Sequence, residues 1–181
     1  MDTFLPYSDR NLIITGSIGS EQATIVRQIA ERLRMPFISL EALIAARVDL
    51  PADEIRAYYG ETRLKAIEAE IVQETTLRRN TVIRISGRTL FHGDNMARLR
   101  QTGEIICLTI SLGAMLRKLH ISMGARFHDP NERALALAEL KREWAVNELE
   151  DLRKLDVTYM ADEAVVTTIV DLWRELSIQR G

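Results

Sequence analysis

The residues best suited to chemistry lie in one loop near the start of the chain. Residues 12–30 read LIITGSIGSEQATIVRQIA, an apolar segment followed by glycines and then by a helical pattern. A glycine-rich turn between a strand and a helix presents backbone N–H groups at the helix N-terminus, where they can hold a phosphate. The candidate nucleotide-contacting residues of this loop are Gly16, Ser17, Gly19, Ser20 and Thr24.

Phosphoryl transfer needs more than this turn, and the further groups are missing. In the pattern G-x-x-x-x-G-K-[ST], the lysine reaches the phosphates and the hydroxyl ligates magnesium. Here Glu21 stands at the last glycine, Gln22 at the lysine and Ala23 at the hydroxyl. A carboxylate about 4 Å from a phosphate oxygen is repelled by up to ~4 kcal/mol at an effective dielectric of about 20. A strand–turn–helix joint without a ligand is therefore the alternative reading of this segment.

Three arginines are candidates to replace the missing positive charge. Arg27 falls one turn into the first predicted helix, whereas Arg84 and Arg88 flank the end of the third predicted strand. Any one of them would restore a cation if it reached the loop. The alternative is that Arg27 and Arg88 are solvated surface residues and that Arg84 pairs with a neighbouring acid.

Short β-branched segments alternate with helical patterns along the chain. The predicted strands cover residues 11–15, 36–40, 81–86, 104–110 and 156–160. The predicted helices cover residues 21–34, 40–48, 51–79 with a break near Gly60, 93–102, 112–119, 131–154, and 162–178 with Asp162 as N-cap. This alternation predicts an α/β fold whose parallel sheet is covered by helices on both faces. Without a repeat or a linker, residues 1–181 are predicted to form one domain.

Composition limits the classes of function. With 46% hydrophobic and 28% charged residues, the chain has the composition of a globular protein. Its 24 basic and 26 acidic side chains give a net charge of -2, which disfavours a nucleic-acid partner. No apolar run approaches the roughly 18 residues of a membrane span, and residues 1–10 lack the pattern of a signal peptide. A cytoplasmic protein with no membrane and no nucleic-acid partner is expected.

Cysteine and histidine give no sign of a redox or metal site. The single cysteine, Cys107, lies within the apolar run EIICLTI, so a buried hydrophobic role is expected. His92, His120 and His128 lack the spacing of metal ligands, and surface or packing roles are expected for them. No metal site is predicted.

From residue 12 to about residue 173, the chain resembles the shikimate kinase family. GSIGSEQAT is similar to that family's G-x-x-G-x-G-K-S-T loop, and MPFISLEALI is similar to its P-F-x-D-x-D-x-x-I segment, with Ser39 and Glu41 at the aspartate positions. VIRISGRTL stands where the family has a glycine triplet, of which only Gly87 matches. NMARLRQTGEIICLTIS closely resembles the family's N-x-x-x-L-x-x-x-G-x-V-V-x-L segment.

A further motif lies in the predicted helical region after the second strand. YYGETRLKAIEAEIV resembles the family's G-E-x-x-F-R-x-x-E. Gly60, Glu61 and Glu68 match this pattern, whereas Leu64 and Lys65 stand at the phenylalanine and arginine.

The resemblance implies a P-loop NTPase-type three-layer fold with a five-stranded parallel sheet. It implies a substrate-binding helical region at about residues 41–79 and a mobile lid at about residues 120–131. Arg126, in GARFHD, is the candidate lid arginine, and Arg142, in ELKREW, is the candidate late-helix arginine that grips the substrate carboxylate. The predicted substrate-binding residues are Glu41, Lys65, Gly87, Arg126 and Arg142.

The chemistry motifs depart from the family where the fold motifs agree with it. The family's first aspartate organises magnesium, which Ser39 cannot do, and its second holds substrate hydroxyls, which Glu41 could do only with a different reach. Lys65 keeps the charge of the family's arginine but not its planar two-pronged fit to a carboxylate, which argues against shikimate as the ligand. No catalytic position is intact, and the degenerate ones are Gln22, Ala23 and Ser39.

Two classes of function remain open. The first, which the residues favour, is a catalytically impaired pseudokinase that binds a metabolite or a protein partner without ATP or magnesium. The second is a working ATP- and magnesium-dependent small-molecule kinase, acting on shikimate or a related substrate, whose catalytic charge has been relocated. The chain is expected to be a monomer or a homodimer, since the amphipathic residues 131–154 suit either a solvated helix or a dimer surface.

Overall fold

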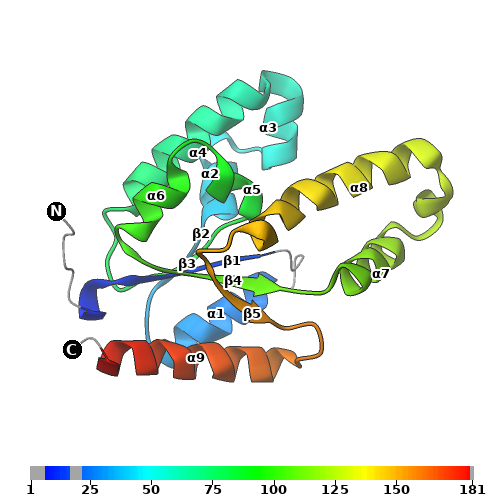
Figure 1. The fold of residues 1–181 in the computed structure, drawn as a ribbon. Coiled ribbons are helices and arrows are strands. Elements are labelled where there is room, and N and C mark those ends of the chain that lie inside the picture. Colours follow the sequence, from blue (N-terminus) through cyan, green and yellow to red (C-terminus); the bar gives the residue numbers. More distant parts are fainter. Residues whose placement is uncertain (1–6, 17–21, 180–181) are drawn as a thin grey trace.

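The computed structural model describes residues 7–16 and 22–179, and Figure 1 shows their fold. Its centre is a five-stranded parallel sheet with the order β2-β3-β1-β4-β5. The strands are β1 (Asn11–Gly16), β2 (Phe37–Ser39), β3 (Val82–Arg84), β4 (Gly103–Thr109) and β5 (Arg153–Asp156). The predicted parallel sheet is confirmed.

Helices cover both faces of this sheet. The helices α1 (Gln22–Leu33) and α9 (Asp162–Gln179) lie together on one face, below the sheet in Figure 1. The other side carries α2 (Leu40–Val48), α3 (Ala52–Tyr59), α4 (Glu61–Thr75), α5 (Gly87–Phe91) and α6 (Asn95–Arg100). The chain therefore forms the three-layer arrangement that the sequence predicts.

A helical arm extends away from the sheet on the right of Figure 1. It consists of α7 (Leu112–Met123), the 3-10 helix η2 (Gly124–His128) and α8 (Pro130–Trp144). A second 3-10 helix, η3 (Ala145–Glu148), leads from α8 back to the sheet, and a third, η1 (Tyr7–Asp9), precedes β1. No residue of α8 is buried, but Met115 of α7 is, and Leu140 and Trp144 of α8 pack partly buried against the same apolar core.

Two apolar layers fix the helices on the sheet, because a strand points successive side chains to opposite faces. In β1, Leu12 and Ile14 belong to the layer under α1 and α9, whereas Ile13 belongs to the layer under α4. Cys107 of β4 is fully buried in the second layer, as predicted. Burial raises the pKa of its thiol to about 11, so the thiol stays protonated at neutral pH.

The fifth strand lies earlier than predicted. The sequence predicts a strand over residues 156–160, whereas β5 covers Arg153–Asp156 and pairs with β4. This edge strand is mostly exposed, so its sequence RKLD has no apolar alternation that would mark it. The chain turns directly after it, where the Asp156 carboxylate accepts a hydrogen bond from the Thr158 backbone N–H at 2.9 Å.

Helix ends also differ from the prediction. A single helix is expected over residues 131–154, but α8 ends at Trp144 because the following η3 turns inward and buries Val146 against Gly87. The short helix α5 is not predicted at all, and it is capped by Ser86, whose hydroxyl accepts from the Thr89 N–H at 3.1 Å. The helix α7 runs past its predicted end to Met123. Asp162, predicted as an N-cap, is the first residue of α9.

No helix in the described part of the chain is both long and apolar enough to cross a bilayer.

Gly103 provides a test of the strand register. A Cβ atom there would lie 1.9 Å from the carbonyl oxygen of Asn11, its partner in β1. We expect Gly103→Ala to lower the free energy of unfolding by more than about 2 kcal/mol in urea denaturation, because only backbone movement can relieve this clash. Gly113→Ala in α7 is the matched control, since its nearest neighbour is the Arg117 side chain at 3.8 Å. The control should be neutral or stabilising by up to ~1 kcal/mol, and an equal effect of both changes would contradict the register.

Candidate functional site

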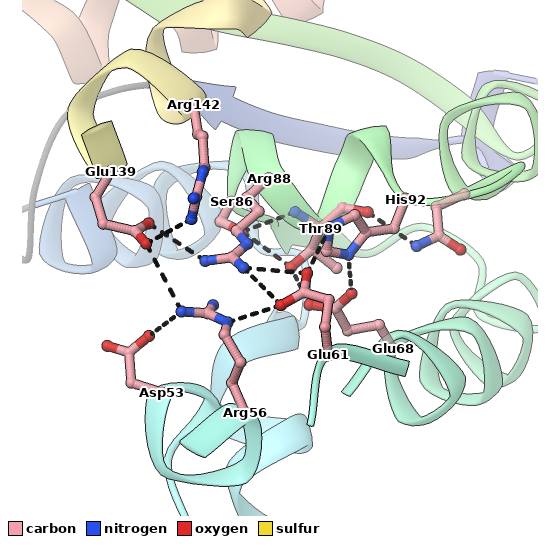
Figure 2. A network of polar contacts seen from close by, with 11 residues as sticks. Asp53, Arg56, Glu61, Glu68, Ser86, Arg88, Thr89, His92, Glu139 and Arg142 are labelled. Carbon is pink, nitrogen blue, oxygen red and sulfur yellow. Dashed lines mark hydrogen bonds and ion pairs between the residues drawn. The ribbon is translucent and has the colours of Figure 1, made fainter. Parts of the chain in front are cut away.

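A pocket of about 590 Å³ lies among α3, α4, α5 and the end of α8. It adjoins the carboxyl end of β3, the side on which parallel sheets usually bind ligands. Figure 2 shows that its charged side chains come from all four helices and point toward one another. The pocket is lined by Arg56, Glu61, Arg88, Phe91, His92, Arg142 and Ala145.

An ion-pair network joins the arginines of this pocket. Arg88 donates through Nη2 to both carboxylate oxygens of Glu61, at 3.1 and 2.9 Å, and through Nη1 to Glu139 at 3.2 Å. Arg56 Nε lies 3.0 Å from the same Glu61 carboxylate. Arg142 donates to Glu139 at 2.8 Å. The network thus connects α3, α4, α5 and α8, and an anionic ligand would share or replace these carboxylates as a partner of the arginines.

Exposure divides these arginines into two kinds. The Arg88 side chain is 15% exposed and has carboxylates on two helices as partners. The Arg142 side chain is 58% exposed and has one. A guanidinium has five N–H donors, so Arg142 can bind a ligand and still keep Glu139. Arg88 suits a structural role and Arg142 suits ligand binding.

Glu61 stands at the centre of the network. Burial by itself would raise its pKa, but the hydrogen bond from Arg88 and the positive charges of Arg88, Arg56 and His92 lower the pKa below its ordinary value. A lowered carboxyl pKa means that Glu61 contributes stability above its unfolded-state pKa. That contribution is lost as the pH falls through the lower folded-state pKa.

A buried carboxylate supports the wall of the pocket. Glu68 is 2% exposed, accepts a hydrogen bond from Thr89 Oγ1 at 3.0 Å and pairs with His92 Nδ1. The second ring nitrogen of His92, Nε2, lies 3.7 Å from a carboxylate oxygen of Glu61. His92 is 14% exposed and lines the pocket. His92 thus has a structural role as the mostly buried partner of two acids, and no sequence spacing connects it to them.

The two positions that match the family's aspartates form a separate group. Glu41 accepts hydrogen bonds from Ser39 Oγ at 3.0 Å, from Arg84 Nη1 at 2.8 Å and from the Ser86 backbone N–H. Ser39 Oγ also accepts from the Ala42 N–H at 3.5 Å as the N-cap of α2. Arg84 pairs with a neighbouring acid, as one of the two alternatives predicts. Neither Ser39 nor Glu41 is among the residues that line the pocket.

The loop after β1 is described only at its ends, because Ser17, Gly19 and Ser20 lie outside the described residues. Gly16 has a φ of 139°, and a Cβ atom there would lie 2.1 Å from the Leu108 carbonyl oxygen. The approach of β4 therefore requires this glycine, whatever the loop binds. Thr24 is exposed on α1.

The described ends of this loop do not fit magnesium and a triphosphate. Gln22 is 1% exposed, and its Nε2 has no hydrogen-bond partner in the described part of the chain. It can offer a hydrogen bond but no charge. Ala23 has no ligand atom, and the Ser39 hydroxyl is engaged by Glu41 and by the cap of α2.

None of the three candidate arginines supplies the missing charge in this structure. Arg27 is exposed and stacks over the Phe37 ring, with 5.4 Å between its guanidinium carbon and the ring centroid. Arg84 is paired with Glu41. Arg88 is paired within the pocket, so the prediction that it is a solvated surface residue is wrong. Among the described residues, no cluster of three His, Cys, Asp or Glu side chains could hold a metal ion.

The predicted substrate-binding residues are not brought together. Of the five, Arg142 lies in the described pocket. Lys65 is exposed on α4, outside the pocket. Gly87 is buried against Val146, and a Cβ atom at residue 87 would lie 3.1 Å from the Val146 side chain. Arg126 lies in η2 at the end of the arm, 68% exposed. The sequence reasoning missed Arg56, Phe91 and His92 as lining residues, and no motif or spacing marks them.

Together, the strand order, the two helical layers and the glycine at the end of β1 define a P-loop kinase fold. The chain belongs to the shikimate kinase family, because the family model described as shikimate kinase matches residues 19–173. The shikimate kinase of Geobacter sulfurreducens is 32% identical over 173 residues, which cover 94% of this chain and 94% of the relative.

Solved structures agree with this assignment. A shikimate kinase from Bacteroides thetaiotaomicron superposes with a TM-score of 0.72 at 21% identity, covering 92% of this chain and 97% of the other. A shikimate kinase from Acinetobacter baumannii in complex with shikimate gives a TM-score of 0.73 at 18% identity, covering 93% and 95%. The fold and the family predicted from the motifs are confirmed.

The difference between Arg88 and Arg142 can be measured as stability. We expect Arg88→Met to lower the free energy of unfolding at pH 7 by about 1–3 kcal/mol, because Glu61 and Glu139 lose a half-buried partner. Arg142→Met is the matched control, and it should change stability by less than about 0.5 kcal/mol because this side chain is mostly solvated. Urea denaturation of both variants gives the comparison. Equal losses would mean that Arg88 does not hold the network together.

Proposed function

We propose that this protein is a cytoplasmic, catalytically impaired member of the shikimate kinase family that keeps its substrate-side pocket as a binding site for a small carboxylic acid. One observation carries the proposal. The positions that would hold phosphate and magnesium carry neutral or engaged side chains, whereas the pocket among α3, α4, α5 and α8 keeps three arginines.

The loss of phosphoryl transfer follows from charge. The transferred phosphoryl group needs positive charge near its oxygens, and magnesium usually supplies part of it. Gln22 is neutral, and Arg27, Arg84 and Arg88 are exposed or paired with other groups. A single missing group could be bypassed, but here the lysine, the hydroxyl and the aspartate positions all lack the required chemistry.

Retention of ligand binding follows from the guanidinium groups. Planar, two-pronged donors match a carboxylate, and the pocket has Arg142 with donors to spare, beside Arg88 and Arg56. These arginines can bind a carboxylate in the pocket, whereas Lys65 is exposed outside it. Shikimate, the ligand named for the Acinetobacter baumannii structure, is a hydroxylated carboxylic acid and gives the ligand class. A protein partner on the same face is the competing occupant.

The loss of nucleotide binding can be tested by calorimetry with ATP and Mg²⁺. We expect a dissociation constant weaker than about 1 mM for the unaltered protein. The triple change Glu21→Gly, Gln22→Lys, Ala23→Ser should tighten binding by at least about 100-fold, because it removes a repelling carboxylate and restores the cation. Gln28→Lys, at an exposed position of α1, is the control for added charge. Micromolar, magnesium-dependent binding by the unaltered protein would favour a working kinase with relocated charge.

Ligand binding can be tested with shikimate as the probe. We expect calorimetry to show binding to the unaltered protein, with no phosphorylated product when ATP and Mg²⁺ are added. Arg142→Met should weaken shikimate binding by about 10-fold or more, the cost of a charge-assisted hydrogen bond, while stability stays unchanged. Arg63→Met is the matched control, because Arg63 is exposed on α4 outside the pocket. If the unaltered protein, Arg142→Met and Arg63→Met bound shikimate with equal affinity, Arg142 would not be the residue that binds its carboxylate.

A further inference from the structure

We infer that His92 is the residue through which the pocket contacts a ligand hydroxyl, and that the buried carboxylate of Glu68 holds it in position. The inference rests on the proposed binding of a hydroxylated carboxylic acid. The inference adds His92 to the residues that would bind the ligand. His92 lies between the segments VIRISGRTL and NMARLRQTGEIICLTIS, so no family motif includes it.

The first ring nitrogen is committed to Glu68. The two carboxylate oxygens of Glu68 have different partners, since Oε2 pairs with His92 Nδ1 and Oε1 accepts from Thr89 Oγ1 at 3.0 Å. With 2% exposure, this carboxylate cannot turn to water instead. An ionised carboxylate that is buried needs such partners, because desolvation otherwise makes its charge costly. We therefore expect Nδ1 to carry a proton and to donate it in a hydrogen bond to Glu68 Oε2.

The helix that directly precedes His92, α5, is itself fixed. The hydroxyl of Ser86 caps α5 and donates to Thr89 Oγ1 at 2.9 Å. The side-chain amide of Asn95, which is 1% exposed, donates to the Thr89 carbonyl oxygen at 2.8 Å. These bonds hold the turn between α5 and α6, so the imidazole ring has a defined position at the edge of the pocket (Figure 2).

The second ring nitrogen is the one that a ligand can reach. Nε2 lies 3.7 Å from Glu61 Oε1, beyond the usual range of a hydrogen bond. The other charged groups around the pocket are Arg56 and its partner Asp53 of α3, Arg88 of α5, and Glu139, Arg142 and Glu143 of α8. A carboxylate bonded to one imidazole nitrogen fixes which nitrogen faces the ligand.

These positions allow two contacts to one small molecule. Arg142 would bind the carboxylate of the ligand, and His92 Nε2 would bind a hydroxyl of the same ligand. Nε2 accepts a hydrogen bond when the ring is neutral and donates one when the ring is protonated. A site that hydrogen-bonds a hydroxyl rejects the analogue that lacks it, because the polar group of the protein is then left without a partner. The Glu68–His92 pair would thus select hydroxylated acids.

The position of the proton can be measured without a ligand. Long-range ¹H–¹⁵N spectra of the imidazole rings should show that the proton of the neutral His92 ring is on Nδ1. In Glu68→Gln, the amide oxygen is kept on the Thr89 side and the amide NH₂ group faces Nδ1, so the proton should move to Nε2. His120 and His128 serve as internal references in the same spectra. A neutral His92 with its proton on Nε2 in the unaltered protein would overturn the inference.

The ligand contact can be measured with two probes, shikimate and 1-cyclohexene-1-carboxylate, which share the ring and carboxylate but differ in the hydroxyls. The unaltered protein should prefer shikimate. His92→Asn places its amide nitrogen as many bonds from Cβ as Nδ1, so it keeps the bond to Glu68 and lacks Nε2. This variant should lower the preference by roughly threefold to tenfold and keep its unfolding midpoint.

The opposite variant completes the test. His92→Gln places an amide nitrogen as many bonds from Cβ as Nε2, so it should keep the preference for shikimate. It should lose stability, because Glu68 Oε2, which pairs with His92 Nδ1, is left without that partner. An unchanged preference in His92→Asn would overturn the inference. If neither probe binds, the proposed function fails and the ligand contact with it. If shikimate binds and the proton lies on Nε2, the inference about His92 fails alone.

Discussion

The pocket depends on one interaction, the pairing of the half-buried Arg88 guanidinium with carboxylates from two other helices. Arg88 belongs to α5, Glu61 to α4 and Glu139 to α8, so a single side chain joins three segments of the chain. Neither a guanidinium nor a carboxylate tolerates partial burial alone, and each makes the burial of the other possible. α8 contributes no fully buried residue, so this electrostatic connection adds to the partly buried contacts that Leu140 and Trp144 make with the core.

The packing of Val146 on Gly87 positions the residues that follow, Arg88 and His92. Val146 of η3 packs directly on Gly87, and a side chain larger than hydrogen at that position would push η3 and the end of α8 away. The next residues then carry Arg88 into the network and, one turn on, His92 onto Glu68. The glycine that the family resemblance assigns to substrate contact thus has a packing role that would keep it in place without any substrate.

The core and the nucleotide positions of this protein respond differently to substitution. The two apolar layers need only residues of the right polarity and size. Phosphoryl transfer needs particular charges at particular atoms, and a neutral glutamine or an alanine cannot approximate them. For this reason the sheet and its apolar layers identify the fold independently of which residues occupy the phosphate loop.

Local pattern was sufficient for the strands of the sheet and for burial of Cys107, because each depends on neighbouring residues or on one apolar segment. It was insufficient for β5, whose exposed edge has no apolar alternation, and for α5, which is too short to show a period. The pocket itself was decided by tertiary structure. Arg56 belongs to α3, Arg142 to α8, and His92 directly follows α5. Ion pairs leave no periodicity in a sequence, so only the packing of these helices could bring the three side chains together.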